Sequence, residues 1–283
     1  PEFLRLAADL RREAPAAHIT VGGHFPSFAD AELLDLSPDL DSVVRGEGEF
    51  TLLELVQRLD DRQSWSGIQG LSFRQQGRVV RTPPRPLVKD LDTLPFPVRD
   101  TPPQRDLGMW FSPILGSRGC HRDCSFCSIS AFYGASGGSP QRFRGVANLA
   151  QEMEDLYHRF GVRFFVFNDD EWFPAGRARV DRVDALGTEL RRRKLDAIMS
   201  IKCRADDVKE GLFRRLLEMG VVRAYVGVES GSDHSLRTLN KHTTAAQNER
   251  ALETLNRVGI LADFGLIFFD PDSTVEDIRA NLG

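Results

Sequence analysis

The 283-residue sequence predicts an α/β protein with two regions, a doubly wound parallel sheet in residues 1–66 and a partial (β/α) barrel in residues 108–283. Three observations predict this class. Short runs rich in β-branched residues alternate with amphipathic helices, two of the early runs end in glycine turns, and five βα repeats follow one another in the second region. Such alternation favours parallel sheets with helices packed on them.

Composition excludes several classes of function. The chain is 41% hydrophobic and 28% charged, and its 37 Lys plus Arg against 41 Asp plus Glu give a net charge of -4. No broad basic face is expected, so bulk nucleic-acid binding is excluded. The most apolar stretch, residues 260–269, is far shorter than the roughly 20 residues that cross a bilayer. We expect no membrane association, no signal peptide and a cytoplasmic location.

The first region reads as helix, strand, helix, strand, helix. Residues 2–13 place Phe3, Leu6 and Leu10 on one helix face, and the apolar run at 19–21 follows. A second helix carries Leu33, Leu34 and Leu36, a second strand spans 42–44, and a third helix continues to Leu59. The two glycine turns, at 22–24 and 46–48, come after the strands, where parallel sheets bind their ligands.

Residues 67–107 form the predicted connection between the two regions. The stretch 70–82 alternates around Gln75-Gln76-Gly77 like a β-hairpin, and seven of the 15 prolines fall between Pro83 and Pro103. This composition predicts a hairpin followed by a linker with little regular structure.

The second region contains the repeated βα units. Strands are predicted at 113–115, 164–167, 197–201, 223–228 and 261–268, and helices include 147–160, 208–219 and 245–258. Gly220 and Gly259 stand where helix C-caps are expected. The chain stops before a sixth strand, so we expect a C-terminally truncated barrel and a fragment of a longer protein.

The most informative segment is a C-x3-C-x2-C run made by Cys120, Cys124 and Cys127, directly after the first strand of the second region. Only four cysteines occur, which argues against a disulfide framework and for a thiolate site in a reducing compartment. Three thiolates on one loop can hold three irons of a cubane cluster and leave the fourth iron open. The alternative is a structural zinc site completed by His121 or by the distant Cys203.

These residues, together with Phe126, resemble the C-x3-C-x-Φ-C signature of the radical SAM superfamily. The stretch 167–173 is similar to the F-x-D-D-x-F segment of that family, residues 203–206 to the polar end of its third strand, and residues 227–231 to its G-x-E-S-G turn. The resemblance implies a TIM-like radical SAM barrel whose functional residues lie at the strand C-termini.

Residues 21–26, 44–49 and 91–97 resemble the partial Rossmann-like, cobalamin-binding type of domain that precedes the barrel in the B12-dependent subclass. Two departures accompany this resemblance. The front of that domain is absent, and the chain has no D-x-H-x-x-G motif for ligation of cobalt by histidine. After the fifth barrel strand the chain has Phe269-Asp270-Pro271-Asp272-Ser273-Thr274 where the family often has G-x-P-G-E-T.

The resemblance implies a [4Fe-4S] cluster, S-adenosylmethionine (SAM) and, for the first region, cobalamin. It assigns the cluster to Cys120, Cys124 and Cys127, SAM to Phe126, Asp169, Asp170, Arg204 and Glu229, and cobalamin to Gly22, Gly23, His24, Gly46, Glu47 and Gly48. Asp169 or Asp170 would accept from the SAM ammonium, Arg204 would form a fork with the SAM carboxylate, and Glu229 would accept from the ribose or the amine.

Each of these residues also has a structural interpretation. The aspartates could cap the next helix, Arg204 could pair with Asp206, and Glu229 could be a surface acid in a turn. Cys203 is expected to be a buried hydrophobic residue at a strand end, and residues 191–194 the cationic end of a helix.

The expected function is reductive cleavage of SAM to a 5'-deoxyadenosyl radical in a cobalamin-dependent C-methyltransferase or a related biosynthetic enzyme. The alternatives are a hydrogen-abstracting radical SAM enzyme with a vestigial B12 domain, and a non-catalytic zinc or Fe–S module. A small-molecule or peptide substrate and an electron donor such as flavodoxin or ferredoxin are the expected partners.

Overall fold

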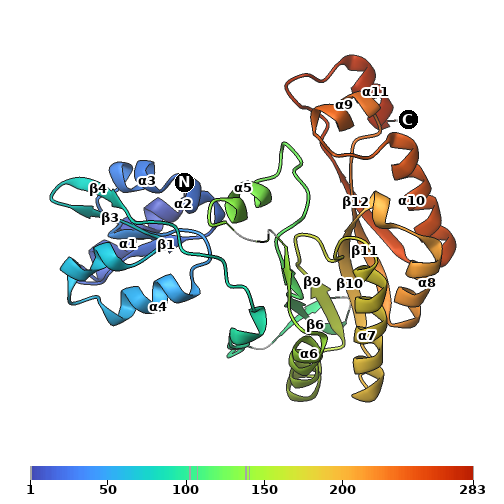
Figure 1. Cartoon of the computed structure of the whole chain (residues 1–283), viewed down its shortest axis with the longest axis horizontal. Coiled ribbons are helices and arrows are strands. Elements are labelled where there is room, and N and C mark those ends of the chain that lie inside the picture. Colours follow the sequence, from blue (N-terminus) through green and yellow to red (C-terminus); the bar gives the residue numbers. More distant parts are fainter. Residues whose placement is uncertain (1, 102, 107, 138, 140, 283) are drawn as a thin grey trace. The chain divides into compact units, whose positions relative to one another are not determined.

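A computed structural model describes residues 2–101, 103–106, 108–137, 139 and 141–282. The chain divides into two compact units. Unit 1 comprises residues 1–88 and 128–140, and unit 2 comprises residues 89–127 and 141–283 (Figure 1). None of the described helices combines the length and the apolar character needed to cross a membrane.

Unit 1 is built on a four-stranded sheet of order β1-β2-β3-β4. Its elements are α1 (Glu2–Glu13), β1 (Thr20–Gly22), α2 (His24–Phe28), α3 (Asp30–Leu36), β2 (Ser42–Val44), α4 (Glu49–Gln57), the 3-10 helix η1 (Arg62–Gly67), β3 (Leu71–Gln75), β4 (Arg78–Arg81) and α5 (Ile129–Gly134). Strands β1 and β2 are parallel, whereas β3 and β4 add to β2 as an antiparallel hairpin. The hairpin predicted in the connection therefore belongs to this sheet, and the sheet is mixed rather than wholly parallel.

Both faces of this sheet are covered, because successive side chains of a strand point to opposite faces. Val43 packs in a cluster with residues of α1 and α3, and the adjacent Val44 packs in a second cluster with Leu55 of α4 and Trp65 of η1. The turn of the hairpin has Gln76 and Gly77 both at positive φ, 50° and 75°, as a tight two-residue turn requires.

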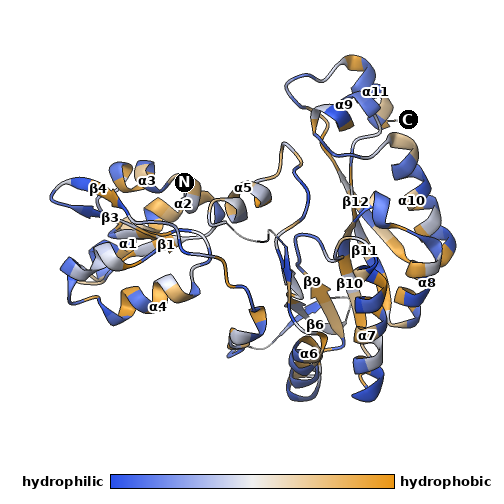
Figure 2. Ribbon diagram, viewed as in Figure 1, coloured by the Kyte–Doolittle hydropathy of each residue, from blue (hydrophilic) through white to orange (hydrophobic). Residues whose placement is uncertain are grey.

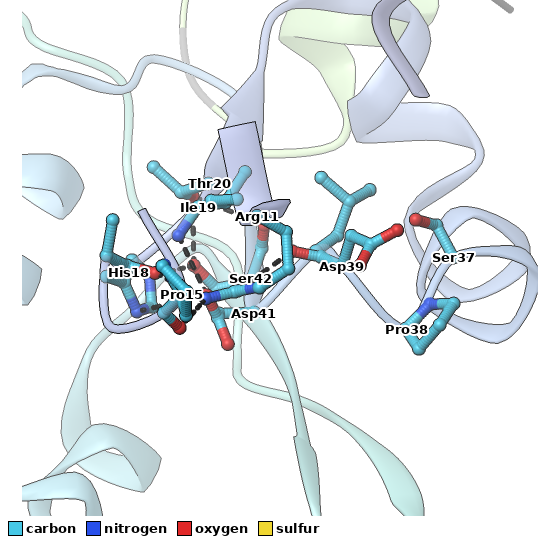
Figure 3. A network of polar contacts seen from close by, with 12 residues as sticks. Arg11, Pro15, His18, Ile19, Thr20, Ser37, Pro38, Asp39, Asp41 and Ser42 are labelled. Carbon is cyan, nitrogen blue, oxygen red and sulfur yellow. Dashed lines mark hydrogen bonds and ion pairs between the residues drawn. The ribbon is translucent and has the colours of Figure 1, made fainter. Parts of the chain in front are cut away.

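A polar network fixes the end of α1 against the start of the two parallel strands (Figure 3). Arg11 pairs with Asp41 at 2.6 Å and donates to the Ala17 carbonyl at 2.7 Å, and Asp41 also accepts from the Ile19 amide at 2.8 Å. His18 lies 2.9 Å from the buried Ser42 hydroxyl, and burial lowers the pKa of His18. This network lies at the strand ends opposite the glycine turns and serves the fold.

Unit 2 contains a six-stranded sheet of order β12-β11-β10-β9-β6-β5. Its elements are the 3-10 helix η2 (Leu91–Thr93), β5 (Gln104–Asp106), β6 (Met109–Ile114), β7 (Ser117–Arg118), β8 (Arg142–Phe143), α6 (Val146–Phe160), β9 (Phe164–Phe167), α7 (Ala178–Arg192), β10 (Ile198–Arg204), the 3-10 helix η3 (Ala205–Asp207), α8 (Glu210–Glu218), β11 (Val221–Glu229), α9 (Asp233–Thr238), α10 (Ala245–Val258), β12 (Leu261–Leu266) and α11 (Val275–Leu282). All pairings in the six-stranded sheet are parallel except that of β5 with β6. The unit is a partial TIM-like barrel, as predicted.

The core of unit 2 lies between these strands and helices α6, α7, α8 and α10. Figure 2 shows the strands as largely hydrophobic and the helices as two-sided, which is the pattern of amphipathic helices on a buried sheet. Helix α10 begins at a capping box of Thr244 and Gln247 and ends at Gly259, whose φ is 90°. The parallel order brings the C-terminal ends of five strands to one edge of the sheet.

Candidate active site

The cysteine loop occupies residues 119–127 of unit 2, directly after β7. Cys124 is buried, and Cys120 and Cys127 are partly buried. The Cys127 amide donates to the Cys124 carbonyl at 3.1 Å, which closes a turn between these two cysteines. The loop is also held by the segment after α9, since the Ser125 amide donates to the Leu239 carbonyl and the Asn240 side chain donates to the Asp123 carbonyl.

Among the described residues, no group of three or more His, Cys, Asp or Glu side chains is drawn together as for a single metal ion. A cubane cluster makes a different demand, because each cysteine ligates a different iron. The donor set fits that demand, because three thiols lie on one loop and the Arg204 guanidinium donates to Cys124 Sγ at 3.6 Å. Burial raises the pKa of Cys120 to about 11, so iron has to displace the proton of that thiol. With a cluster bound, the Cys124 thiolate would face the arginine.

Asp169 and Asp170 follow β9 and hold residues 116–119, the segment that leads into the cysteine loop. Asp169 is 1% exposed and accepts from the Gly116 amide at 3.0 Å and from the Ser117 hydroxyl at 2.5 Å. Burial raises the pKa of Asp169 to about 6, opposed by these donors and by the nearby Arg182. Asp170 accepts from the Gly119 amide at 2.8 Å. The structure thus shows the two carboxylates positioning the loop, and their contact with SAM stays a prediction.

Arg204 ends β10, and all three of its guanidinium nitrogens have acceptors. Nε donates to Asp206 at 2.8 Å, Nη1 to Cys124 Sγ, and Nη2 to the Lys241 carbonyl. Arg122, from the cysteine loop, also pairs with Asp206 at 2.8 Å. The pairing of Arg204 with Asp206 that the sequence suggests is therefore present, and it is buried rather than solvated, since Arg204 is 4% exposed.

Glu229 ends β11 in the left-handed region, with φ of 64°, where a residue other than glycine is strained. Its Oε1 lies 3.0 Å from Nζ of the buried Lys241, which also lies 5.8 Å from the centre of the half-exposed Phe126 ring. A Cβ on Gly227 would fall 2.7 Å from the lysine Nζ, so any other residue at this position would displace the lysine end of the pair. Glu229 is thus part of a buried ion pair rather than a surface acid.

Two residues of this site are absent from the sequence prediction. Lys241 is one lysine in a polar loop, twelve positions after Glu229, and no local pattern marks it. Glu171 lies inside the recognised segment but is 2% exposed, and burial, followed by the nearby Asp207, raises its pKa to about 8. Cys203 is part of the hydrophobic core, as predicted.

In unit 1 the two glycine turns lie side by side, because β1 and β2 pair in parallel from Thr20 to Gly22 and from Ser42 to Val44. The Ser27 hydroxyl joins them by donating to the Gly23 carbonyl at 2.6 Å and accepting from the Gly46 amide at 2.9 Å. Glu47 is buried and accepts from the Val88 amide at 2.8 Å. Gly48 precedes α4, and its Cβ would lie 3.2 Å from a methyl group of Val44.

The ring of His24, at the start of α2, stacks on Phe132 of α5 with ring centres 3.9 Å apart and planes 8° apart. Tyr133 meets the same imidazole edge-on. The aromatic residues of α5 come directly after the cysteine loop in sequence, yet they belong to unit 1. Sequence reasoning missed them because nothing in the local pattern assigns this helix to the first sheet.

A partial parallel barrel with three cysteines on one loop at its strand C-termini defines a class of cluster-binding barrel enzymes. The Radical SAM superfamily model matches residues 114–282 of the chain. The chain therefore belongs to the radical SAM superfamily, whose members use a [4Fe-4S] cluster and SAM.

Other relatives extend over both units. The chain is 30% identical over 269 residues to an uncharacterized methyltransferase of Pyrococcus horikoshii, covering 93% of this chain and 56% of that protein. The cobalamin-dependent SAM radical enzyme OxsB matches with a TM-score of 0.77 and 22% identity over 99% of this chain and 41% of that one. The radical SAM methyltransferase TsrM from Kitasatospora setae matches with a TM-score of 0.78 and 20% identity over 99% of this chain and 55% of that one. The chain spans about half the length of the curated relatives it matches.

Proposed function

We propose that this chain provides the cofactor-binding part of a cobalamin-dependent radical SAM enzyme that transfers a methyl group to an unactivated carbon, or drives a related radical reaction in biosynthesis. The observation that carries the proposal is the loop of Cys120, Cys124 and Cys127 at the strand C-termini of a barrel that belongs to this superfamily. The substrate is a small molecule or peptide, and the electron comes from a flavodoxin or ferredoxin.

The bound cluster and SAM supply reductive cleavage of SAM to methionine and a 5'-deoxyadenosyl radical. The residues of the chain bind and orient the cluster and SAM. Asp169 and Asp170 hold the start of the cysteine loop through the Gly116 and Gly119 amides, which fixes where Cys120 stands. Buried, hydrogen-bonded supports of this kind keep a site in its productive geometry.

The pair of Glu229 and Lys241 is the proposed site for the amino-acid end of SAM. That end carries an ammonium and a carboxylate, and the pair offers a carboxylate and an ammonium 3.0 Å apart in a largely buried position. Charge-assisted hydrogen bonds to both groups orient the ligand. Phe126, which is 44% exposed and borders Lys241, is placed to pack against the adenine.

Cobalamin is proposed to bind unit 1 at the two glycine turns. Support comes from the adjacent turns at 22–24 and 46–48, and from the descriptions of OxsB as cobalamin-dependent and of TsrM as a methyltransferase. Backbone amides and small residues at strand C-termini let a large ligand approach closely. Gly22, Gly23, His24, Gly46, Glu47 and Gly48 are the residues we assign to this site.

The cluster is tested by anaerobic reconstitution with iron and sulfide, reduction with dithionite, and EPR with and without SAM. We expect a reduced-cluster signal that changes when SAM is added. Cys124→Ala should lose it, and Cys203→Ala should keep it, because Cys203 is buried in the core and outside the loop. A colourless zinc-loaded protein, or a signal that ignores SAM, would contradict the proposal and favour a structural metal site.

A second candidate is a radical SAM enzyme that abstracts hydrogen without cobalamin. The observation that favours it is the His24 ring, which is already stacked on Phe132. Hydroxocobalamin is added to the purified chain, free corrinoid is removed by gel filtration, and the visible spectrum is recorded. Cobalamin binding is supported if corrinoid stays with the protein, and if the amount retained falls in Gly46→Val but not in Gly77→Val, which alters the hairpin turn. SAM-responsive clusters without retained corrinoid support the second candidate.

A further inference from the structure

Arg204 is the buried cation of unit 2 that contacts a cluster cysteine. Its Nη1 lies 3.6 Å from Cys124 Sγ, a distance suited to an N–H donor and a sulfur acceptor, and the side chain is 4% exposed. The other two nitrogens of the fork donate to Asp206 and to the Lys241 carbonyl. Three of the five N–H groups of the guanidinium are thus taken by protein acceptors, one of them a cysteine sulfur.

Arg204 lies among other charged side chains of unit 2. Asp206 is shared between two arginines, with Arg204 Nε at 2.8 Å and Arg122 Nη2 at 2.8 Å. Glu171 also lies near the guanidinium and adds negative charge when it is ionised. The contact between Nη1 and Sγ places the cation directly beside Cys124, where burial reduces screening by water.

We propose that Arg204 sets the reduction potential of the cluster by donating an N–H···S hydrogen bond to the Cys124 thiolate. The inference rests on the cluster of the proposed function. Reduction adds one electron, supplied by a low-potential one-electron donor, and takes the cluster from the 2+ to the 1+ state without bond changes. The added negative charge is stabilised by a cation and a hydrogen bond at a ligand sulfur, which raises the potential.

The test is an EPR-monitored redox titration of the reconstituted chain in the absence of SAM, with dithionite as reductant. In Arg204→Gln we expect the ratio of reduced to oxidised cluster at a fixed potential to fall about tenfold, which is 59 mV for a one-electron couple. Arg204→Lys, which keeps the charge and loses the fork, should shift in the same direction by less. Arg122→Gln is the matched control, because the Arg122 side chain shares Asp206 while its contact to a cysteine sulfur is made by the backbone amide, which the substitution keeps. Its potential should shift less than that of Arg204→Gln.

The inference is overturned if the reduction potential measured without SAM is unchanged in Arg204→Gln while SAM binds more weakly. That result would indicate that Arg204 binds the SAM carboxylate. If Arg204→Gln does not assemble a cluster, Arg204→Lys decides: a downward shift supports the inference and an unchanged potential overturns it. A wild-type chain without a reducible cluster is a failure of the proposed function. If the wild-type chain has a reducible cluster and both Arg204 variants have the same potential as the wild type, this inference alone is wrong.

Discussion

The strand ends of unit 2 and the glycine turns of unit 1 hold their residues by different means. In unit 2, charged side chains of the site are buried, with Asp169, Glu171, Arg204 and Lys241 all at most 4% exposed, and Arg204 contacts the cysteine loop directly. In unit 1, two backbone turns are joined by one serine hydroxyl and by the pairing of their strands. A site held by buried charges is sensitive to each charge, whereas a site held by backbone tolerates single side-chain changes.

The largest effect is expected at Asp169. Asp169→Ala removes the acceptor of the buried Gly116 amide and Ser117 hydroxyl and takes away one of the two carboxylates near Arg182, so unit 2 should lose about 3 kcal/mol. Urea unfolding in a Trp65→Phe background reports on unit 2, because Trp110 and Trp172 remain there. Iron content after reconstitution should fall in parallel.

Asp170→Ala is the matched control, since Asp170 is exposed and supports one backbone amide. Its cost should be about 1 kcal/mol. Equal effects of the two substitutions would show that burial of the charge is not what holds the loop, and would remove the contrast between the two units.

Lys241→Met is expected to have an effect of similar size. It leaves Glu229 without its cation in a largely buried position, which should cost about 3 kcal/mol in the same urea experiment. SAM should also bind at least tenfold more weakly, as measured by equilibrium dialysis. The double variant Lys241→Met with Glu229→Gln should recover most of the stability but not the affinity. If the double variant recovers both the stability and the affinity for SAM, Glu229 and Lys241 do not bind SAM.

How far the sequence predicts this molecule depends on whether the signal is local. Strand β9 and helix α10 have the predicted bounds, 164–167 and 245–258, because their apolar periodicity and caps are local. Strand β6 begins at Met109 rather than at 113, and the predicted helix around Leu33 is two helices separated at Ala29. These boundaries depend on the pairing with β5 and on packing, which a single periodicity does not contain.

The site divides in the same way. The three cysteines are readable from spacing, since one loop carries them. The partners of Asp169, Arg204 and Glu229 are not. Gly116 and Cys124 come from an earlier βα unit and meet Asp169 and Arg204 through the parallel order of the sheet, and Lys241 meets Glu229 because the chain turns back after helix α9. Sequence therefore predicts which residues stand at the strand ends, and the fold determines what they contact.

The stability of unit 2 is expected to depend on pH through Glu171, and that of unit 1 is not. Burial raises the pKa of Glu171 to about 8 from an ordinary 4.5, so the folded chain keeps a proton that the unfolded chain releases. Stability of unit 2 should therefore fall as pH rises between these values, by about 1.4 kcal/mol per unit at most and by about 2 kcal/mol from pH 6 to pH 8. Urea unfolding of the iron-free, Trp65→Phe protein measures the slope.

Glu171→Gln should flatten that slope, because the glutamine side chain does not titrate. Its amide oxygen can still accept from the Phe173 amide, as the Glu171 carboxylate does. A slope that survives this substitution would assign the pH dependence to another group. In a Trp110→Phe, Trp172→Phe background, the remaining Trp65 reports on unit 1, and its fluorescence should not follow the Glu171 titration.

The smallest effect is expected at Ser27, which lies in unit 1. Ser27→Ala removes the hydroxyl between the Gly23 carbonyl and the Gly46 amide, and since both are near solvent the cost should be about 1 kcal/mol. The unfolding of unit 1 is followed through Trp65 in a Trp110→Phe, Trp172→Phe background. Ser64→Ala, which removes an exposed hydroxyl bond to the Asp61 carbonyl, is the matched control. If Ser27→Ala instead lowers the free energy of unfolding as much as Asp169→Ala does, the single Ser27 hydroxyl stabilises the glycine turns as strongly as the buried Asp169 stabilises the segment before the cysteine loop. The backbone pairing of β1 with β2 would then be insufficient to hold the turns together.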